Sequence, residues 1–342
     1  MKKILSYLNK LNILYNKLLF RDIDPKGIKF YLLEIETKKI TFEWIENNIK
    51  EGDEYKLRHK LDKLYKKILG REIDKYGYLN YTNLINKQLL NLEQLEKDLY
   101  RSGEFISKKL NGIDKIFYIN LDRSEKRNNK MINLLNQLNI DFERFQAVDG
   151  NDIDINNIIF KNNALHKNFF DFIEMSNKFE VACTLSHLKL LKKILNEKSN
   201  YFLVLEDDIN FENLRYFKYD LKKIIDEAPD FDILLLYKTS EKIPKCIYTK
   251  WDFNYLGTVA YVVNKKNLSK INDYYNIIGD IYDLNNNLKF NSADKYIYRL
   301  LNTYVYKYNI ISTNFNESTI HKEHLEFHRI CIYKNNLELK NL

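Results

Sequence analysis

The sequence predicts an α/β domain that follows a smaller all-helical domain. After Ser107, short β-rich apolar runs alternate with amphipathic segments, which is the pattern of strands and helices in an α/β protein. Before Ser107, one helical pattern occurs twice. A length of 342 residues also favours two domains over a single core. We place the helical domain at residues 1–110 and the α/β domain at residues 111–342.

An internal repeat fills the first hundred residues. LYNKLLFRDID, which starts at Leu14, aligns with LYKKILGREID, which starts at Leu64, so the offset is 50 residues (64 − 14). The match continues without a gap through three further pairs: Gly27 and Gly77, Tyr31 and Tyr81, Glu54 and Glu104. Two copies of one helical unit are therefore expected.

Each copy has an Asp-x-x-Gly turn between two predicted helices. Asp24 and Asp74 can cap the helix that follows, because a carboxylate accepts hydrogen bonds from its first N–H groups. Gly27 and Gly77 tolerate backbone angles that are closed to other residues. These four residues therefore have a conformational role in our interpretation.

The composition predicts a globular, soluble protein. Hydrophobic residues make up 45% of the chain, and this fraction excludes a disordered protein. The formal charge of +8 comes from 55 basic and 47 acidic residues, which are interspersed, so a dedicated nucleic-acid surface is not expected. The positive excess favours an anionic ligand or peripheral contact with an anionic membrane surface. A solvated, lysine-rich surface is the plainer interpretation.

Cysteines and the N-terminus indicate a cytoplasmic location. Cys183, Cys246 and Cys331 are too few and too widely spaced for a disulfide framework or a zinc motif. Polar residues such as Asn9 and Lys10 interrupt what would be the apolar part of a signal peptide. No run approaches the ~20 apolar residues that span a bilayer.

The elements of the second domain follow from residue patterns. Strands are predicted over residues 115–121, 142–148, 201–205, 232–237 and 258–263, and helices over 124–139, 180–196, 214–227 and 292–301. This alternation predicts a mostly parallel sheet with helices on both faces. Ligands are then expected at the carboxyl ends of the strands.

Three acids end the apolar run YFLVLEDD. Adjacent carboxylates repel one another and need a cation or strong solvation to coexist. In an extended segment Glu206 and Asp208 point to one side and Asp207 to the other, so two carboxylates can share a Mg²⁺ or Mn²⁺ ion. A solvated acidic turn is the alternative.

A polar turn also follows the first predicted strand of this domain. In INLDRSEKR, Ser124 can cap a helix whose free N–H groups would meet phosphate or ribose oxygens, and Arg123 and Arg127 add positive charge.

Five motifs in order resemble glycosyltransferase family 25 over about residues 113–325. They are INLDRSEKR, FQAVDG, ACTLSH, LEDD and LGTVAY. That family includes bacterial lipooligosaccharide galactosyltransferases and the collagen galactosyltransferase domain. The resemblance implies a Rossmann-like GT-A fold, a UDP-sugar donor, a divalent cation (Mn²⁺ or Mg²⁺) and an inverting transfer. Ala182 departs from the glycine that is more usual in the family.

The resemblance also implies site residues. The residues expected at the donor are Asn120, Leu121, Arg123, Arg127, Asp149, Ser186, His187, Asp207 and Gly257. The residues expected at the metal are Glu206, Asp208 and His321. Buried support is the alternative role for Ser186 and His187, and a core or surface position is the alternative for His321.

Asp294 is the predicted general base. It lies after the LGTVAY strand, at a helix start, where similar enzymes place an acid that removes the acceptor proton. A helix-capping role is the alternative. Asp280 and Asp283 are the other candidates for the base.

The predicted function is transfer of a hexose, galactose from UDP-galactose by preference, to a hydroxyl of a glycan, glycolipid or protein. The resemblance to the bacterial members of the family further implies a role in lipopolysaccharide biosynthesis. A non-catalytic sugar-nucleotide-binding scaffold, whose repeats recruit a protein partner, is the alternative. The repeats resemble a bacterial helical repeat domain of unknown function, which implies association or targeting, and a simple helical spacer is equally compatible.

Overall fold

The computed structural model describes residues 2–37, 39–153, 158–160, 178–278, 281–284, 292–313 and 325–340. By its internal contacts the chain divides into two compact units, Met1–Tyr100 and Arg101–Leu342. The predicted α/β class with a helical N-terminal region is confirmed. The predicted domain boundary at 110 stays a prediction.

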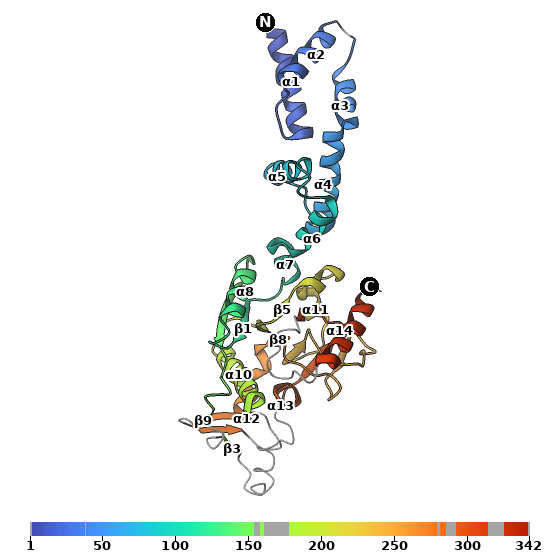
Figure 1. The fold of residues 1–342 in the computed structure, drawn as a ribbon. Coiled ribbons are helices and arrows are strands. Elements are labelled where there is room, and N and C mark those ends of the chain that lie inside the picture. Colours follow the sequence, from blue (N-terminus) through green and yellow to red (C-terminus); the bar gives the residue numbers. More distant parts are fainter. Residues whose placement is uncertain are drawn as a thin grey trace. The chain divides into compact units, whose positions relative to one another are not determined.

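The first unit contains two successions of three helices, each long, intermediate and short (Figure 1). They are α1 Lys2–Leu19, α2 Pro25–Glu36 and α3 Phe42–Glu51, followed by α4 Asp53–Leu69, α5 Lys75–Asn86 and α6 Leu92–Arg101. The carboxylate of Asp24 accepts the N–H of Gly27 at 2.9 Å, and that of Asp74 accepts the N–H of Gly77 at 2.8 Å. Both predicted helix caps are therefore confirmed.

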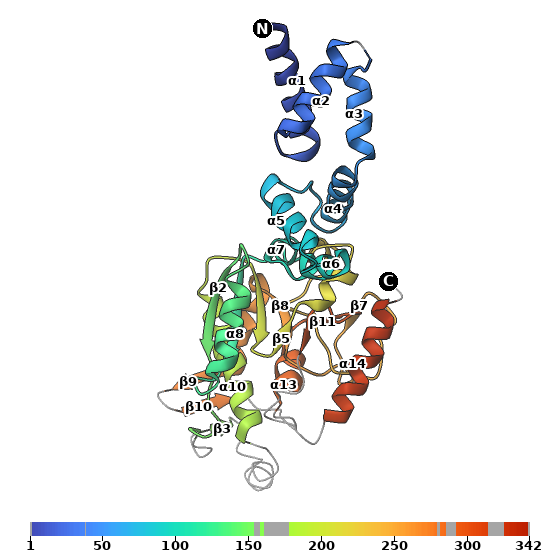
Figure 2. The same ribbon diagram turned by 45° about the horizontal axis from the view of Figure 1, so that its top comes forward.

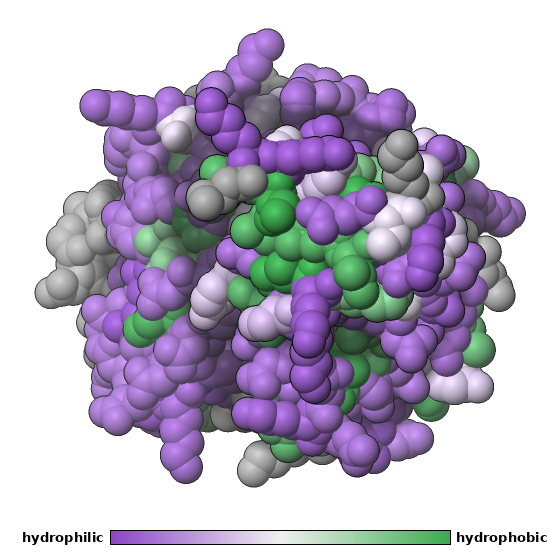
Figure 3. Space-filling view, turned by 90° about the horizontal axis from the view of Figure 1, so that it is seen from above, coloured by the Kyte–Doolittle hydropathy of each residue, from purple (hydrophilic) through white to green (hydrophobic). Residues whose placement is uncertain are grey.

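The first unit has a small core and keeps large apolar side chains on its surface. Leu11 and Ile45 are fully buried, because the helices of the first copy enclose them. Ile13, Phe30 and Leu33 are exposed by half or more. Figure 3 shows a face of the molecule on which hydrophobic residues gather among hydrophilic ones. Among the described residues, no helix is both long and apolar enough to cross a bilayer.

The second unit is built on a seven-stranded sheet of order β2-β1-β4-β8-β6-β11-β7. Its strands are β1 Lys115–Asn120, β2 Asp141–Gln146, β4 Tyr201–Glu206, β6 Ile233–Leu235, β7 Tyr248–Lys250, β8 Ala260–Asn264 and β11 Thr303–Tyr306. β1 is parallel to β2 and β4, whereas β8 is antiparallel to β4 and β6. The sheet is therefore mixed: most of its strands run in one direction, as predicted, whereas β8 and β7 run against them.

Short strands form two smaller sheets in the described part of this unit. One contains β3 Ile158–Phe160, β10 Ile281–Leu284 and β9 Tyr275–Ile278. The other pairs β5 Ile209–Asn210 with β12 Ser312–Thr313. The second pairing brings Thr313 opposite Ile209, directly after the acidic triplet.

Most of the helices predicted for the second unit are present in the structure, together with further ones. They are α7 Gly103–Lys109, α8 Glu125–Leu135, α10 Lys178–Leu195, α11 Leu221–Glu227, α12 Ile271–Tyr274, α13 Ala293–Leu300 and α14 Leu325–Lys340, with 3-10 helices η3 Glu212–Tyr216 and η4 Lys265–Lys270. The single helix predicted over 214–227 is divided into η3 and α11. The cause is Asp220, whose side chain accepts the N–H of Lys223 and starts a new helix.

A buried hydrophobic cluster of the second unit lies on one face of the seven-stranded sheet. Alternate strand residues point to the same side, and this side carries Phe117 of β1 and Val204 of β4, both fully buried. α10 and α13 cover it, and Leu188 of α10 packs into the cluster. On the opposite face α8 lies against β1 (Figure 2), where the hydroxyl of Tyr118 donates to Asn128 Oδ1 at 2.7 Å. Helices therefore cover both faces, as predicted.

Candidate donor and metal site

Polar residues gather where β1, β2 and β4 end and β8 begins. The parallel strands finish at Asn120, Gln146 and Glu206, all at the same edge of the sheet. Because β8 runs the other way, the residues just before it reach this edge as well, and the N–H of Glu206 donates to the carbonyl of Val259 at 2.9 Å. The topology thus brings four of the five sequence motifs to one edge.

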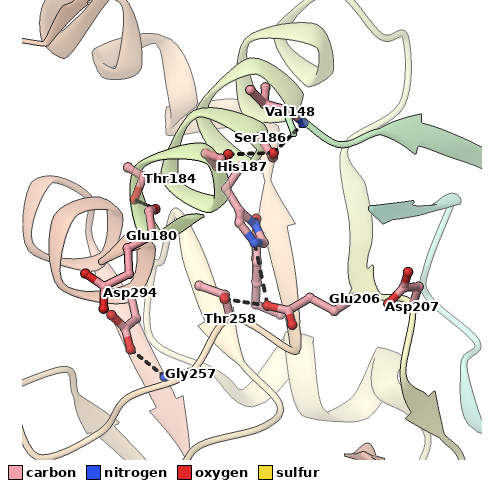
Figure 4. A network of polar contacts seen from close by, with 12 residues as sticks. Val148, Glu180, Thr184, Ser186, His187, Glu206, Asp207, Gly257, Thr258 and Asp294 are labelled. Atoms are coloured by element: carbon pink, nitrogen blue, oxygen red, sulfur yellow. Dashed lines mark hydrogen bonds and ion pairs between the residues drawn. The ribbon is translucent and has the colours of Figure 1, made fainter. Parts of the chain in front are cut away.

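The three acids of the triplet are directed to different partners. β4 ends at Glu206, and Asp207 and Asp208 form a turn, so the extended geometry expected for the triplet was wrong beyond Glu206. Figure 4 shows the side chains of Glu206 and Asp207 pointing away from each other. The three carboxylates therefore have different environments.

Asp207 is held by the last residue of β1 and by a residue of α8. Asn120 donates to its Oδ2 at 2.6 Å, and Arg127 of α8 donates to its Oδ1 at 2.8 Å. Burial raises the pKa of Asp207, while the charge of Arg127 and the hydrogen bond from Asn120 act in the opposite direction. Arg144 of β2 in turn donates to Asn120 Oδ1 at 2.9 Å. These four side chains join β1, β2, α8 and the acidic turn.

Glu206 belongs to a second network, with α10 and β8 (Figure 4). Thr258 donates to its Oε1 at 2.5 Å, and Nε2 of His187 lies 3.7 Å from the same oxygen. Burial acts to raise the pKa of Glu206, but His187 and Thr258 outweigh it and hold the pKa below its usual value. The other ring nitrogen of His187, Nδ1, lies 2.8 Å from the hydroxyl of Tyr261.

Of the three carboxylates, Asp208 has the fewest hydrogen-bond partners among the described residues. It is 8% exposed, and its Oδ1 is buried without a hydrogen-bond partner among the described residues. Burial, together with the charges of Glu206 and Asp207, raises its pKa to about 7. An unpaired buried carboxylate oxygen is costly unless a proton or a cation meets it. Oxygen ligands suit Mg²⁺ and Mn²⁺, so Asp208 fits the hard cation that the sequence suggested.

The predicted nucleotide-facing residues lie on two turns. Arg123 forms an ion pair with Asp149, and Asp149 also accepts the N–H of Asn151 at 2.9 Å. Leu121 is half-buried, and its carbonyl accepts the N–H of Ser124 at 2.9 Å. Ser124 does occupy the N-cap position of α8, but its side chain makes no cap hydrogen bond within the described chain, so the predicted capping by this hydroxyl was wrong.

In the ACTLSH motif, Ser186 has contacts that explain its presence, and the burial of Cys183 defines the state of its thiol. Ser186 is buried, accepts the N–H of Val148 at 2.8 Å and donates to the carbonyl of Ala182 at 2.7 Å. It therefore fastens the FQAVDG turn to α10. Burial raises the pKa of Cys183 well above its ordinary value, so this thiol is no activated nucleophile.

Asp294 and Gly257 meet beside the Glu206 network (Figure 4). Oδ2 of Asp294 accepts the N–H of Gly257 at 2.8 Å, and its Oδ1 accepts the N–H of Lys295 at 2.7 Å. Gly257 has a φ of +99°, and a Cβ there would lie 3.3 Å from Thr239 Oγ1. Backbone conformation alone therefore requires glycine at this position.

Some predicted residues lie outside the described part of the chain. His321 and Asp280 are among them. Asp283 lies in β10, but its side chain is not described. Their roles stay predictions.

Three residues of the site were not predicted from sequence. Thr258 and Tyr261 stand in the LGTVAY motif, which was a usable signal, but their partners are 52 and 74 residues away. Arg144 carried no signal except a charge inside a predicted strand.

Comparisons with known proteins agree with the motifs. Residues 113–274 match the family model of glycosyltransferase family 25 (LPS biosynthesis protein). A glycosyltransferase 25 family member of Aedes aegypti is 34% identical over 131 residues, which are 36% of this chain and 20% of that protein. Procollagen galactosyltransferase 2 of Homo sapiens is 28% identical over 174 residues, which are 47% of this chain and 27% of that protein.

The match is confined to part of each protein. This chain spans about a quarter or less of the length of these relatives. The solved inositol-1-phosphate CTP transferase from T. maritima aligns with 65% of this chain and 97% of its own, with a TM-score of 0.31 and 11% identity, which is too distant to support an argument. From the family match and the five ordered motifs, residues 113–274 form a domain of glycosyltransferase family 25.

Proposed function

We propose that this protein is an inverting glycosyltransferase that transfers a hexose from a UDP-sugar to a hydroxyl group. The observation that supports it most is Asp208, a buried carboxylate with an oxygen that no described residue hydrogen-bonds, at the strand edge of a family 25 domain. Galactose is the proposed sugar, because galactosyltransferases are among the similar proteins. The proposed acceptor is a glycan, a glycolipid or a protein.

Asp208 would hold Mn²⁺ or Mg²⁺, with Glu206 and His321 as further ligands. Such an ion neutralises charge that develops on the departing diphosphate. Glu206 is suited to this role because Thr258 and His187 keep it ionised and fix its Oε1. Asp207 is unsuited to it, since Asn120 and Arg127 engage both of its oxygens.

The nucleotide would lie over the turns after β1 and β2. Arg123 is 45% exposed despite its ion pair, so its guanidinium can reach a phosphate. Asp149, Leu121 and Asn120 would contact the nucleoside. Arg144 acts through Asn120 as a positioning residue, because its own hydrogen bond is to that amide.

Asp294 would accept the proton of the attacking hydroxyl. Inversion requires one base on the acceptor side of the sugar. Each carboxylate oxygen carries two lone pairs, so the two backbone hydrogen bonds of Asp294 orient it and leave acceptor capacity. The half-exposed position of its side chain permits access by a substrate.

A donor-hydrolysis screen tests this proposal. UDP-, GDP- and CMP-sugars are incubated with the full chain and Mn²⁺, and free nucleotide is measured. We expect turnover of UDP-galactose and loss of turnover with a chelator. Preference for a GDP- or CMP-sugar would refute the donor class. Tight UDP binding without turnover on any donor would favour the non-catalytic scaffold.

We further propose a cytoplasmic enzyme of lipopolysaccharide biosynthesis whose repeats contact a partner protein or a membrane surface. The exposed apolar side chains of the first unit support this role. Fractionation of cells that express the full chain, compared with the chain lacking the first 100 residues, tests it. Equal distribution of the two would contradict a targeting role.

A further inference from the structure

A thiol, an imidazole and a carboxylate meet beside the acidic turn. We infer that Cys183, His187 and Glu206 form a binding site for a thiophilic divalent cation, Zn²⁺. One ligand atom from each residue can be chosen so that all three lie within 4.8 Å of one another. This site differs from the proposed metal site at Asp208 in having a sulfur ligand, and its existence does not depend on the transfer reaction.

The spacing of the imidazole and the carboxylate fits a tetrahedral ion, and the thiol lies within 4.8 Å of both. Cys183 and His187 are one helical turn apart on α10, so their side chains share a face. With Zn–N and Zn–O bonds of about 2.0 Å, two such ligands on one tetrahedral ion lie about 3.3 Å apart. Nε2 of His187 and Oε1 of Glu206 are 3.7 Å apart, too long for a hydrogen bond but close to this separation. Closure around an ion needs only a small side-chain movement.

The surrounding residues orient the ligands. His187 is 1% exposed, and the hydroxyl of Tyr261 at 2.8 Å from Nδ1 fixes its ring, so that Nε2 is the nitrogen directed at Glu206. Thr258 fixes the carboxylate from another side at 2.5 Å. Metal-binding histidines in proteins characteristically have such a partner on the second nitrogen.

The ligand chemistry selects the ion. Sulfur and imidazole ligands favour Zn²⁺, whereas Mg²⁺ and Mn²⁺ favour oxygen. On binding, the Cys183 S–H proton is released to solvent and a sulfur–metal bond forms. Thiolate and carboxylate then balance the two charges of the ion, which makes the complex neutral in a largely buried place. A fourth position stays open for water.

The site shares Glu206 with the proposed donor site. Zn²⁺ would draw this carboxylate away from a hard cation at Asp208, so zinc should weaken UDP binding. This consequence rests on the proposed function, whereas zinc binding itself does not.

Cadmium titration of the full chain tests the inference, because the thiolate-to-Cd²⁺ charge-transfer band reports sulfur ligation directly. Cys246, which is exposed, is first replaced by serine to remove an unrelated thiol. We expect one equivalent of Cd²⁺, displaced by Zn²⁺, with the band lost in Cys183→Ser and retained in the matched control Cys331→Ser. Tyr261→Phe should weaken binding by about 10–100-fold, since it removes only the partner of Nδ1.

No band in the Cys246→Ser protein, or a band that persists after Cys183→Ser, would overturn the inference. Circular dichroism of each variant shows whether it is folded. If Cys183→Ser does not fold, the weaker Cd²⁺ binding expected for Tyr261→Phe tests the inference instead. Failure of UDP binding with a normal Cd²⁺ band would count against the proposed function alone.

Discussion

The helical repeats and the strand edge of the second unit are held together in opposite ways. In the repeats, contacts are local and occur twice: Asn12 accepts the N–H of Ile23, and Asp62 accepts the N–H of Ile73, each across 11 residues. At the strand edge, Asn120 contacts Asp207 across 87 residues. Local contacts build each repeat, and the ion pair of Arg21 with Glu54 joins the two copies, whereas a change at the strand edge should affect several elements at once.

The largest expected effect is on turnover. Asp294→Asn should lower transfer by about 10²–10⁴-fold, because the amide cannot accept the acceptor's proton. Steady-state kinetics measure the loss, and UDP affinity should persist as the control. Near-normal turnover would move the role of base to Asp280 or Asp283. Retention of the anomeric configuration, read by NMR of the product, would overturn the inverting mechanism.

Truncation separates the two regions. A chain that begins at Ser102 keeps the cap of α7 and should fold and hydrolyse donor normally, since Ser102 accepts the N–H of Phe105. A chain that begins at Ser107 loses buried Phe105 and Ile106, each worth about 2 kcal/mol. Thermal melts and donor hydrolysis compare them. Equal stability of both chains would show that α7 does not belong to the second core.

Two ion pairs within the site, Arg127 with Asp207 and Arg123 with Asp149, offer a matched comparison. Arg127→Met removes a partner of buried Asp207 and should destabilise the fold by about 2–4 kcal/mol. Arg123→Met breaks a more exposed pair and should cost less than about 1 kcal/mol. Urea unfolding measures both. Equal losses of unfolding free energy in the two variants would mean that the contacts of Asp207 do not hold distant elements together.

The smallest effect concerns the repeat caps. Backbone N–H groups of Gly27 and Gly77 hold the pKa values of Asp24 and Asp74 below their ordinary range. A carboxyl whose pKa is lower in the folded than in the unfolded state stabilises the fold at pH values above the unfolded pKa of about 3.9. This stabilisation is lost as the pH falls through the pKa of the folded state. Asp24→Ala and Asp74→Ala should therefore reduce the pH dependence of stability in acid by equal amounts. Acid unfolding followed by circular dichroism measures this. A difference between them would break the equivalence of the repeats.

Sequence reasoning succeeded where the determining interactions are local. The repeat, its Asp caps and strand β4 with its acidic end follow from neighbouring residues. The antiparallel direction of β8 could not be predicted, because an apolar run has no direction, and this strand decides that Thr258 meets Glu206. The split between η3 and α11 was missed because Asp220 was not recognised as a cap.

The site was predicted as a set of residues but not as an arrangement. Glu206 and Asp208 were expected to act alike, yet one is held by His187 and Thr258, while the other has an oxygen without a hydrogen-bond partner in the described part of the chain. Such differences depend on chain segments that meet only after folding. Motif order along the sequence contains no information about them.

Calorimetry of UDP binding tests the central claim most directly. Titrations of the full chain with UDP are made in Mn²⁺ and in chelator, and repeated with Asp208→Asn, which keeps the size of the side chain but removes its charge. We predict that UDP binds the wild type only with the metal, and that the variant loses this binding while staying folded. UDP affinity that is unchanged in the variant and insensitive to chelator would show that the acidic triplet is only a turn.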